Sequence, residues 1–227
     1  MGGRASRVDG SAMLYAWAWE AGIMTEQRTI GVLHGVSIDV AAWDGAKAAV
    51  DLSFACMFER ELTGNGPTGG LRHLDDALGG ALTELRRAGY FQAKPMETLL
   101  INRPPATIVA KAIMLVGLGD PSTWSPALTA EAAATALRAA IQQDARSAAF
   151  APSLLDTGLM PNATSGVADA MLKAVADAIS TQAHLAAMDL AAPHALRQWV
   201  FDVGLEHLDA TTEHFQATFA ALTPWQR

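Results

Sequence analysis

Residues 62–70 read Leu62-Thr63-Gly64-Asn65-Gly66-Pro67-Thr68-Gly69-Gly70, a glycine-rich stretch. It follows an apolar run from Ala49 to Phe58 and precedes a helical pattern that begins at Leu71, which indicates a loop between a β-strand and an α-helix. Such a loop exposes backbone N–H groups at the positive end of the helix, where anions such as phosphates bind. The stretch predicts either an anion-binding loop or a flexible connector, and both interpretations stay open.

Strand and helix patterns alternate along the chain. Strand patterns cover 30–40, 50–58, 98–102, 112–119, 147–151 and 199–201, and helical patterns cover 71–88, 165–184 and 205–222. A further helix is predicted to begin at Ser125-Pro126 or at Thr129. The run 50–58 is apolar on both faces, which is typical of a strand covered on both sides. This order predicts an α/β fold, a three-layer α/β/α sandwich with a mixed sheet of about six strands.

The patterns also predict where four individual residues lie in the expected strand and helix. His34 interrupts the even-numbered apolar positions of the 30–40 run and is expected on a strand face. Gly79 and Gly80 weaken the predicted helix by about 1 kcal/mol each relative to alanine, so they are expected where another backbone approaches closely. Gly89 is expected just beyond the end of this helix, as a C-cap glycine.

The composition limits the kinds of partner. The 227 residues carry a formal net charge of −7 and contain no run of lysine and arginine, which argues against binding of nucleic acid through its phosphates. About half of the residues (51%) are apolar, enough for a globular core. No apolar stretch has the length of a membrane span, so no membrane partner is expected. The first residues lack the pattern of a secretory signal, so the expected location is cytoplasmic.

Candidate nucleophiles and metal ligands are few. Cys56 lies inside an apolar run and is expected as a small buried side chain rather than a nucleophile. His207 and His214 lie two turns apart on the last predicted helix, about 10 Å along its axis, which is too far for one metal ion without an intermediate ligand. No Gly-x-Ser-x-Gly motif occurs. The sequence therefore predicts no catalytic residue, no metal and no cofactor.

The glycines at 64, 66 and 69 also have the spacing of the dinucleotide-binding fingerprint. That fingerprint requires a tight turn between strand and helix, and an acidic residue at the end of the next strand. Several residues separate Phe58 from Gly64, and the next predicted strand ends in Ile101-Asn102-Arg103. The fingerprint is therefore discounted.

Three short sequence segments occur in order between Gly70 and Gly119. They are Leu74-Asp75-Asp76-Ala77-Leu78-Gly79-Gly80-Ala81-Leu82, Glu97-Thr98-Leu99-Leu100 and Ala112-Ile113-Met114-Leu115-Val116-Gly117-Leu118-Gly119. In order and spacing they resemble the N-terminal domain of the leucyl aminopeptidase family. A weaker likeness extends from about Ile30 to Phe201. The resemblance implies the fold of that domain.

The catalytic half of that family has no counterpart in these residues. The relatives are metallo-aminopeptidases, and a separate C-terminal domain holds their two metal ions. The ligands come from an Asn-Thr-Asp-Ala-Glu-Gly-Arg motif and a distant Asp-x-Gly-Lys motif, and neither string occurs here. The resemblance therefore implies the fold without the activity, and the chain is expected not to be an enzyme.

That N-terminal domain is in turn similar to the macro domain, the ADP-ribose-binding fold. The likeness rests on Val50-Asp51-Leu52 ahead of the glycine-rich loop, and on a second loop, Asp156-Thr157-Gly158-Leu159-Met160-Pro161. Two such loops at one sheet edge can clamp a diphosphate. Macro domains that remove ADP-ribose carry Asn-Ala-Ala-Asn where this chain has about 55–58, Ala-Cys-Met-Phe. The resemblance therefore does not imply hydrolysis, and it weakens the case for binding.

Two functions follow from the resemblance. The first is a non-catalytic binding or assembly module that forms a homo-oligomer or binds a protein partner. The second is a macro-like module that binds ADP-ribose or a related nucleotide through Gly64, Gly66, Gly69, Gly70, Thr157, Gly158 and Leu159. An enzyme that works through residues without a known motif is a third alternative. The domain is expected over 25–204, with an N-terminal appendage over 1–24 and a C-terminal amphipathic helix over 205–227.

Overall fold

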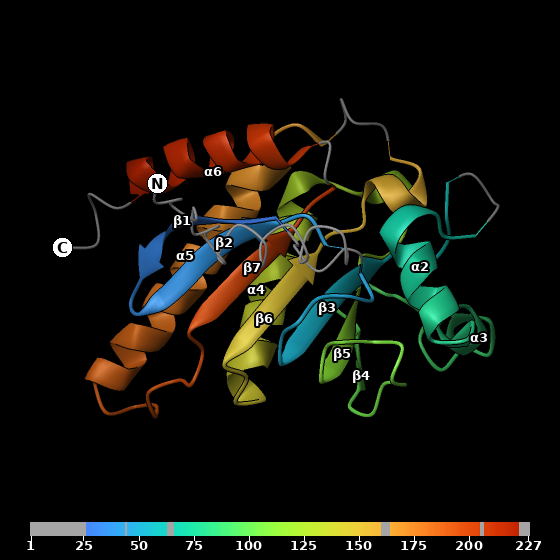
Figure 1. The fold of residues 1–227 in the computed structure, drawn as a ribbon, viewed down its shortest axis with the longest axis horizontal. Helices are drawn as coiled ribbons and strands as arrows, with labels where there is room; N and C mark the ends of the chain where they lie inside the picture. Colours follow the sequence, from blue (N-terminus) through green and yellow to red (C-terminus); the bar gives the residue numbers. More distant parts are fainter. Residues whose placement is uncertain (1–25, 44, 63–65, 160–163, 205–206, 223–227) are drawn as a thin grey trace, which may run out of the picture.

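Seven strands form a single mixed sheet in the order β1-β2-β7-β6-β3-β5-β4 (Figure 1). The computed structural model describes residues 26–43, 45–62, 66–159, 164–204 and 207–222. Parallel pairing joins β2, β7, β6, β3 and β5, while β1 and β4 pair antiparallel at the two edges. The strands are β1 (Gln27–Leu33), β2 (Val36–Ala41), β3 (Leu52–Met57), β4 (Thr98–Ile101), β5 (Ala112–Gly117), β6 (Ser147–Ala151) and β7 (Gln198–Asp202). The predicted α/β class is confirmed, with seven strands instead of about six.

The additional strand comes from residues 30–40, which form a hairpin. β1 ends at Leu33 and β2 begins at Val36, and the two residues between them, His34 and Gly35, have φ of 47° and 79°. Positive φ at both central residues is typical of a type I′ turn, whose twist matches that of the flanking strands. The prediction of His34 on a strand face is wrong, because this residue makes the turn.

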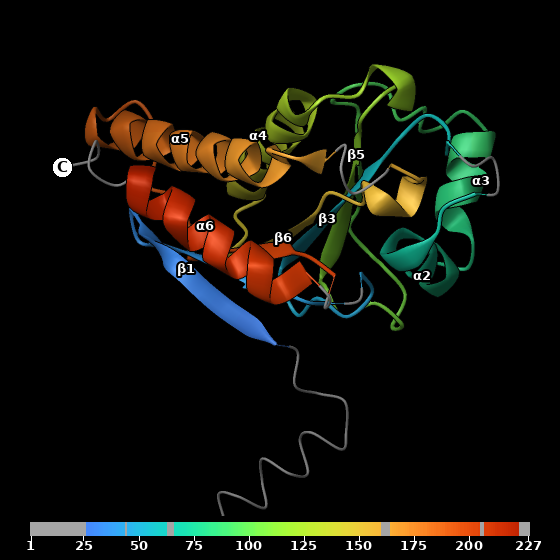
Figure 2. The ribbon, with the colours of Figure 1, turned by 90° about the horizontal axis from the view of Figure 1, so that it is seen from above.

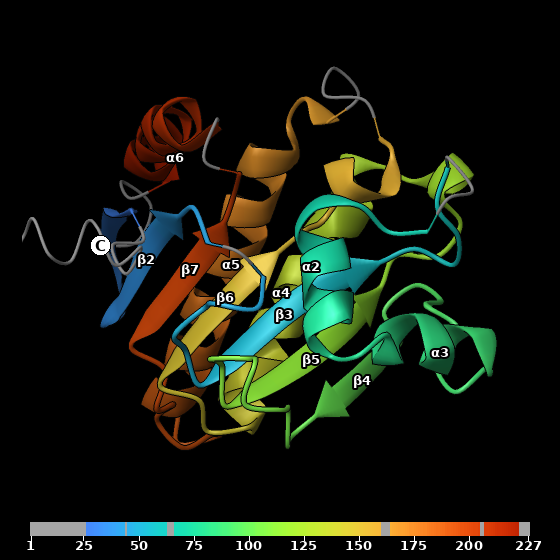
Figure 3. The same cartoon turned by 45° about the vertical axis from the view of Figure 1, so that its right-hand side comes forward.

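Helices cover both faces of the sheet (Figure 2). On one face lie α4 (Pro126–Gln142), α5 (Val167–Ala187) and α6 (Leu208–Leu222), with α6 packed along α5 and against β1 and β2. On the other face lie α2 (Gly69–Ala77) and α3 (Ala81–Arg87), at the end of the sheet that holds β5 and β4 (Figure 3). Two short 3-10 helices, η1 (Pro121–Thr123) and η2 (Leu155–Thr157), follow β5 and β6. These layers form the predicted sandwich.

Each face of the sheet has its own hydrophobic core. The core under α4, α5 and α6 contains ring contacts in which Trp199 lies 6.0 Å from both Phe54 and Phe150, and Phe201 lies 4.8 Å from Phe215 of α6. The core under α2 and α3 is built from Leu71, Leu74, Leu82, Ile113 and Leu115, with the buried connection from β2 to β3 beside it, Ala46, Ala48 and Val50. Alternate residues of the central strands thus enter different cores, which requires strands that are apolar on both faces.

The predicted helix over 71–88 is two helices that meet at Gly79 and Gly80. These residues have φ of 68° and 81°, and a Cβ at either position would meet no atom within 4 Å. The prediction that another backbone approaches closely here is wrong. The two glycines instead adopt the left-handed backbone conformation, which costs other residues free energy. Gly89 follows α3 with φ of 77°, as expected beyond a helix end.

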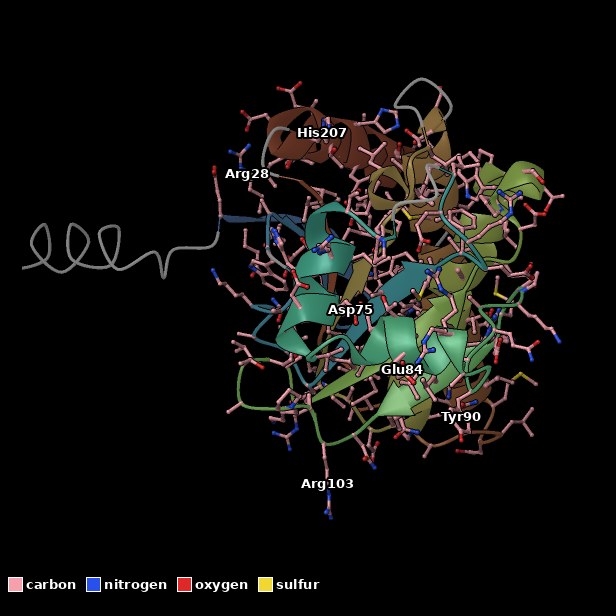
Figure 4. The ribbon with its side chains drawn as sticks, turned by 90° about the vertical axis from the view of Figure 1, so that its right-hand side faces the viewer. Arg28, Asp75, Glu84, Tyr90, Arg103 and His207 are labelled. Carbon is pink, nitrogen blue, oxygen red and sulfur yellow. The ribbon has the colours of Figure 1, made fainter. Side chains whose placement is uncertain are left out.

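The N-termini of α4 and α3 are capped in different ways. Ser125 caps α4, since its hydroxyl accepts the N–H of Leu128 at 3.4 Å, and Pro126 occupies the first position. Asp75, which lies where α2 meets α3 (Figure 4), caps α3 by accepting the N–H of Leu82 at 2.8 Å. Of the two predicted starts of α4, the structure therefore selects Ser125-Pro126. Among the described residues, no helix combines the length and apolarity needed to cross a membrane.

Candidate functional site

A pocket of about 650 Å³ opens at the carboxyl ends of β3, β6 and β7. β5, the next parallel strand after β3, pairs on one side of it, whereas β6 pairs on its other side (Figure 3). Strand order reverses at this point. In open α/β sheets such a reversal leaves a crevice outside the strand ends, and this is where ligands bind.

The pocket is built from segments far apart in the sequence. The contributors are the loop after β2, β3, β6 with the loop that follows it, the start of α2, the first turns of α5, the end of β7 and the first half of α6. Most of the lining side chains are apolar, as is typical of small-molecule sites. The apolar set comprises Phe54, Ala55, Leu71, Leu74, Ala151, Pro152, Leu154, Leu155, Val167, Ala168, Met171, Val203, Ala210 and Phe215.

Two loops meet beside the pocket through Asp156. The backbone carbonyl oxygen of Asp156 accepts hydrogen bonds from Thr68, from its N–H at 3.0 Å and from its hydroxyl at 2.7 Å. The carboxylate oxygen Oδ2 of Asp156 accepts the N–H of Leu71 at 3.0 Å. Leu71 lies in the first turn of α2, the place where the glycine-rich loop is predicted to hold an anion. The structure fills that place with a carboxylate of the protein itself.

The Asp156 carboxylate is partly withdrawn from water. Burial raises its pKa, and the N–H groups of Leu71 and Gly70 and the nearby His73 act in the opposite direction. Because burial disfavours negative charge here, a second anion beside this carboxylate would meet both the same desolvation and a like charge. The electrostatics at the start of α2 therefore oppose phosphate.

The first predicted loop contributes through its last residues. A Cβ on Gly69 would lie 2.0 Å from Oδ1 of Asp156, so only glycine leaves room for this carboxylate. Gly70 lines the pocket. Gly66 has φ of 79° and faces open space, and it is not among the described residues that line the pocket. Gly64 lies outside the described residues.

The second predicted loop forms a short 3-10 helix followed by a turn at Gly158. Thr157 ends η2, and Gly158 follows with φ of 94° and donates its N–H to the carbonyl oxygen of Leu155 at 3.0 Å. Leu159 packs against the core under α4 and α5. Among the described lining residues, this loop is represented by Leu155 and Asp156 instead.

Sequence reasoning missed Asp156 as the residue that joins the loops. An acidic residue just before Thr157-Gly158 was the available signal, but 85 residues separate it from Leu71. Asp202, Trp43, His207 and His214 also line the pocket. They come from the end of β7, the loop after β2 and the start of α6, which no local motif connects.

Asp202 and Trp43 form another part of the lining. Asp202 is 9% exposed, and its Oδ1 accepts the backbone N–H of Trp43 at 2.9 Å. The indole Nε1 of Trp43 is buried without a hydrogen-bond partner among the described residues. At the rim, Nε2 of His214 lies 2.9 Å from Oδ1 of Asp169. The described lining thus carries two carboxylates and two histidines, and no lysine or arginine.

Neither a metal centre nor a reactive thiol forms among the residues that the structure places. Within the described ranges, no three His, Cys, Asp or Glu side chains come together in a way that could hold a metal ion. Cys56 is fully buried, and burial raises the pKa of its thiol far above the usual range. A protonated buried thiol is a packing group, as the sequence predicted.

The family follows from the match of the sequence to a family model. Residues 58–188, more than half of the chain, match the model described as the cytosol aminopeptidase family, N-terminal domain. The chain belongs to this family. No curated protein matches the sequence.

Solved structures show the same fold. A variant of tomato leucine aminopeptidase matches with a TM-score of 0.53 and 19% identity, over 84% of this chain and 37% of the enzyme. The Oceanobacillus iheyensis macrodomain solved with ADP matches with a TM-score of 0.57 and 14% identity, over 88% of this chain and 97% of its own. A Trypanosoma brucei macrodomain matches with a TM-score of 0.53 and 16% identity, over 78% of this chain and 65% of its own. The N-terminal-type domain is therefore macro-domain-like, as the sequence segments predicted, and it spans 37% of the length of the tomato enzyme.

Proposed function

We propose that this domain is a non-catalytic binding module and that the pocket at the carboxyl ends of β3, β6 and β7 is its binding site. The observation that carries the proposal is the pocket, whose volume of about 650 Å³ is in the range of small-molecule sites. Its apolar lining with a few polar groups matches the composition of such sites. The buried, protonated Cys56 and the lack of both metal-binding motifs in these 227 residues support a role without catalysis.

The nucleotide alternative has support from one observation and opposition from another. The two loops of the macro-like hypothesis do meet beside the pocket, through Thr68 and Asp156. However, the Asp156 carboxylate occupies the N–H groups at the start of α2, and no lysine or arginine is among the described lining residues. We therefore favour a ligand without phosphate over ADP-ribose.

The binding site can be tested with one blocking variant and one matched control. Ala210 and Ala217 are both exposed on α6, but only Ala210 lines the pocket. Ala210→Trp should close the mouth, whereas Ala217→Trp adds the same ring elsewhere. Protein-observed NMR with phenethylamine, 2-phenylethanol, 3-phenylpropionate and ADP-ribose supplies the readout. Shifts from at least one probe at pocket residues, lost only in Ala210→Trp, would support the site. No pocket response to any probe would contradict it.

A second candidate function is assembly into a homo-oligomer or with a protein partner. The observation in its favour is that β1 is an edge strand of the described sheet and that Val32 on it is 63% exposed. Exposed edges offer unpaired backbone groups to another chain. We expect light scattering to show a species larger than a monomer, and Val32→Lys to reduce it. Val109→Lys, at a position 55% exposed away from this edge, is the control. A monomer that binds no partner contradicts this role.

A further inference from the structure

We propose that the pocket selects neutral, largely apolar molecules with one carbonyl oxygen, and that this oxygen accepts a hydrogen bond from the indole N–H of Trp43. This inference rests on the proposed binding function and adds the chemical class of the ligand. It follows from a buried donor in the lining, from the way its loop is held and from the apolar walls beside it.

The indole N–H of Trp43 is a donor without an acceptor. Trp43 lines the pocket, and its Nε1 is buried with no hydrogen-bond partner among the described residues. An indole N–H donates and never accepts, so only an acceptor can satisfy it. Buried polar groups of folded proteins are nearly always paired, and each exception needs an explanation. At the wall of a cavity, the explanation we infer is an acceptor that the ligand brings.

The loop that carries Trp43 is held on two sides. Oδ1 of Asp202 accepts the backbone N–H of Trp43 at 2.9 Å. Two residues further on, Gly45 packs against α2, since a Cβ there would lie 3.2 Å from the carbonyl oxygen of Gly70 and 3.7 Å from the Cβ of Leu74. The unpaired donor therefore belongs to a fixed part of the lining. A group that is already positioned favours binding, because little conformational freedom is lost when the ligand arrives.

The cavity gives a ligand room to reach this donor. Its volume is about 650 Å³, and Leu71 and Leu74 of α2 line it together with Trp43. The indole is partly exposed and packs at the margin of the core under α2 and α3, to which both leucines belong. Because the ring borders the cavity, a turn toward it brings Nε1 within hydrogen-bonding distance of a ligand oxygen. The apolar body of the ligand then packs against the leucines.

The donor decides which polar group the ligand carries. A carbonyl oxygen accepts hydrogen bonds and brings no donor that would itself need a partner. An ammonium group has three donors and no acceptor, so it cannot satisfy the indole. A carboxylate does accept, but it would place a negative charge in the same cavity as Asp156, whose own charge is disfavoured by burial. A neutral carbonyl compound meets neither obstacle.

The class is tested by three probes that share a phenyl ring and a short chain. 4-Phenylbutan-2-one carries the carbonyl group, phenethylamine a cation and 3-phenylpropionate an anion. In NMR titrations of the full chain at neutral pH, the ketone should have a Kd at least about tenfold lower than that of either charged probe, and a tenfold ratio corresponds to about 1.4 kcal/mol. The Ala210→Trp variant should remove the response to the ketone.

The hydrogen bond itself is tested on the indole N–H signals. Two other tryptophans of the described ranges are matched references, and neither is among the described lining residues. Nε1 of Trp124 already donates to Oγ1 of Thr129 at 2.9 Å, whereas Nε1 of Trp199 is buried without a partner among the described residues, like that of Trp43. The ketone should move the indole proton signal of Trp43 downfield, as a new hydrogen bond does, and leave the other two signals in place.

Trp43→Phe removes the donor and keeps an aromatic ring in the lining. We expect the Kd of the ketone to rise about tenfold, the scale of one hydrogen bond. The Kd of 2-methyl-4-phenylbut-1-ene, which has a CH2 group in place of the oxygen, should change little. Trp124→Phe is the control and should leave both Kd values unchanged. If Trp43→Phe fails to fold, the Trp43 signal of the unmodified chain still decides whether the bond forms.

Each outcome separates the ligand class from the binding function. A smaller ratio between the ketone and a charged probe, or tighter binding of a charged probe, overturns the carbonyl class while the pocket remains a binding site. An unmoved Trp43 signal, or equal losses for ketone and alkene in Trp43→Phe, overturns the role of the indole. If neither the ketone nor any probe of the proposed function changes the signals of pocket residues, the binding function itself fails.

Discussion

The N-terminus of α4 is capped by a side chain close in sequence, whereas the N-terminus of α2 is capped by one that is far away in sequence. At α4 the cap is local, because Ser125 accepts the N–H of Leu128, three residues further on. At α2 the N-cap residue Thr68 makes no side-chain cap, and Asp156 reaches the helix from a loop 85 residues away. A local cap serves one helix, whereas the distant cap also ties two loops together beside the pocket.

This difference extends to ligand chemistry. A hydroxyl at a helix start is neutral, but the Asp156 carboxylate brings a full negative charge to the position where a phosphate would bind. The contact that completes α2 thus turns an anion-binding geometry into one that opposes anions. The Oceanobacillus iheyensis macrodomain, which has the same fold, has been solved with ADP.

The largest expected effect comes from Gly69→Ala. A Cβ there would overlap Oδ1 of Asp156, and φ is 54°, so the substitution adds backbone strain and expels the cap. We expect a loss of about 2–3 kcal/mol in the free energy of unfolding, the sum of about 1–2 for strain and about 1 for the cap. Urea unfolding measures it. Gly66 has φ of 79° and open space around its Cβ position, so Gly66→Ala should lose stability through backbone strain alone. Equal losses for Gly69→Ala and Gly66→Ala would disprove the contact between residue 69 and Asp156.

Asp156→Ala should have the next largest effect. It removes the distant cap and leaves the N–H groups of Leu71 and Gly70 without their acceptor. We expect a loss of about 2 kcal/mol in urea unfolding. Asp156→Asn keeps a carbonyl oxygen and should lose about half as much. If Asp156→Ala is as stable as the unmodified chain, the carboxylate does not close α2.

Ser125→Ala should cost less, about 1 kcal/mol, because it removes one long hydrogen bond of 3.4 Å at a helix that Pro126 already helps to start. The same unfolding experiment measures this loss. Since the serine is not among the described residues that line the pocket, NMR signals of pocket residues should not move. If Ser125→Ala loses more stability than Asp156→Ala, the local cap contributes more than the distant one, which would contradict the expected order.

The smallest effect is a difference in pH dependence. Burial raises the pKa of Asp156 above its ordinary 3.8, so its favourable contribution is fully present below the unfolded pKa and is lost as pH rises through the folded pKa. Asp51 is the opposite case, since hydrogen bonding to Lys111 lowers its pKa. As pH falls from neutral toward 3.8, the unmodified chain should gain stability relative to Asp156→Asn, and as pH falls further, below 3.8, it should lose stability relative to Asp51→Asn. Unfolding free energies across this range check both signs, and parallel curves would contradict them.

Local patterns predicted much of the fold. The strand over 147–151 has the predicted bounds, and the helix start at Ser125-Pro126 was one of two predicted alternatives. Where the prediction failed, a change of backbone conformation interrupted a continuous apolar pattern. His34-Gly35 divides one predicted strand into a hairpin, and Gly79-Gly80 divides one predicted helix into two.

The site was harder to predict because its key contacts are long-range. The two glycine-containing loops were expected at one sheet edge, and they do meet there. No local pattern could show that Asp156 would enter the space left by Gly69, or that Asp202 would lie beside Trp43. Side chains that meet only after the sheet has assembled leave no periodic signal in the sequence.

The Asp156 carboxylate fills the anion position at the start of α2. The most direct measurement is the melting temperature of the unmodified chain with and without millimolar ADP-ribose. We predict no shift. A ligand at a hundredfold excess over its Kd adds about 2.7 kcal/mol of stability, which is easily seen in the melting temperature. A clear rise that disappears in Ala210→Trp would show that the pocket accepts a diphosphate and would contradict the account.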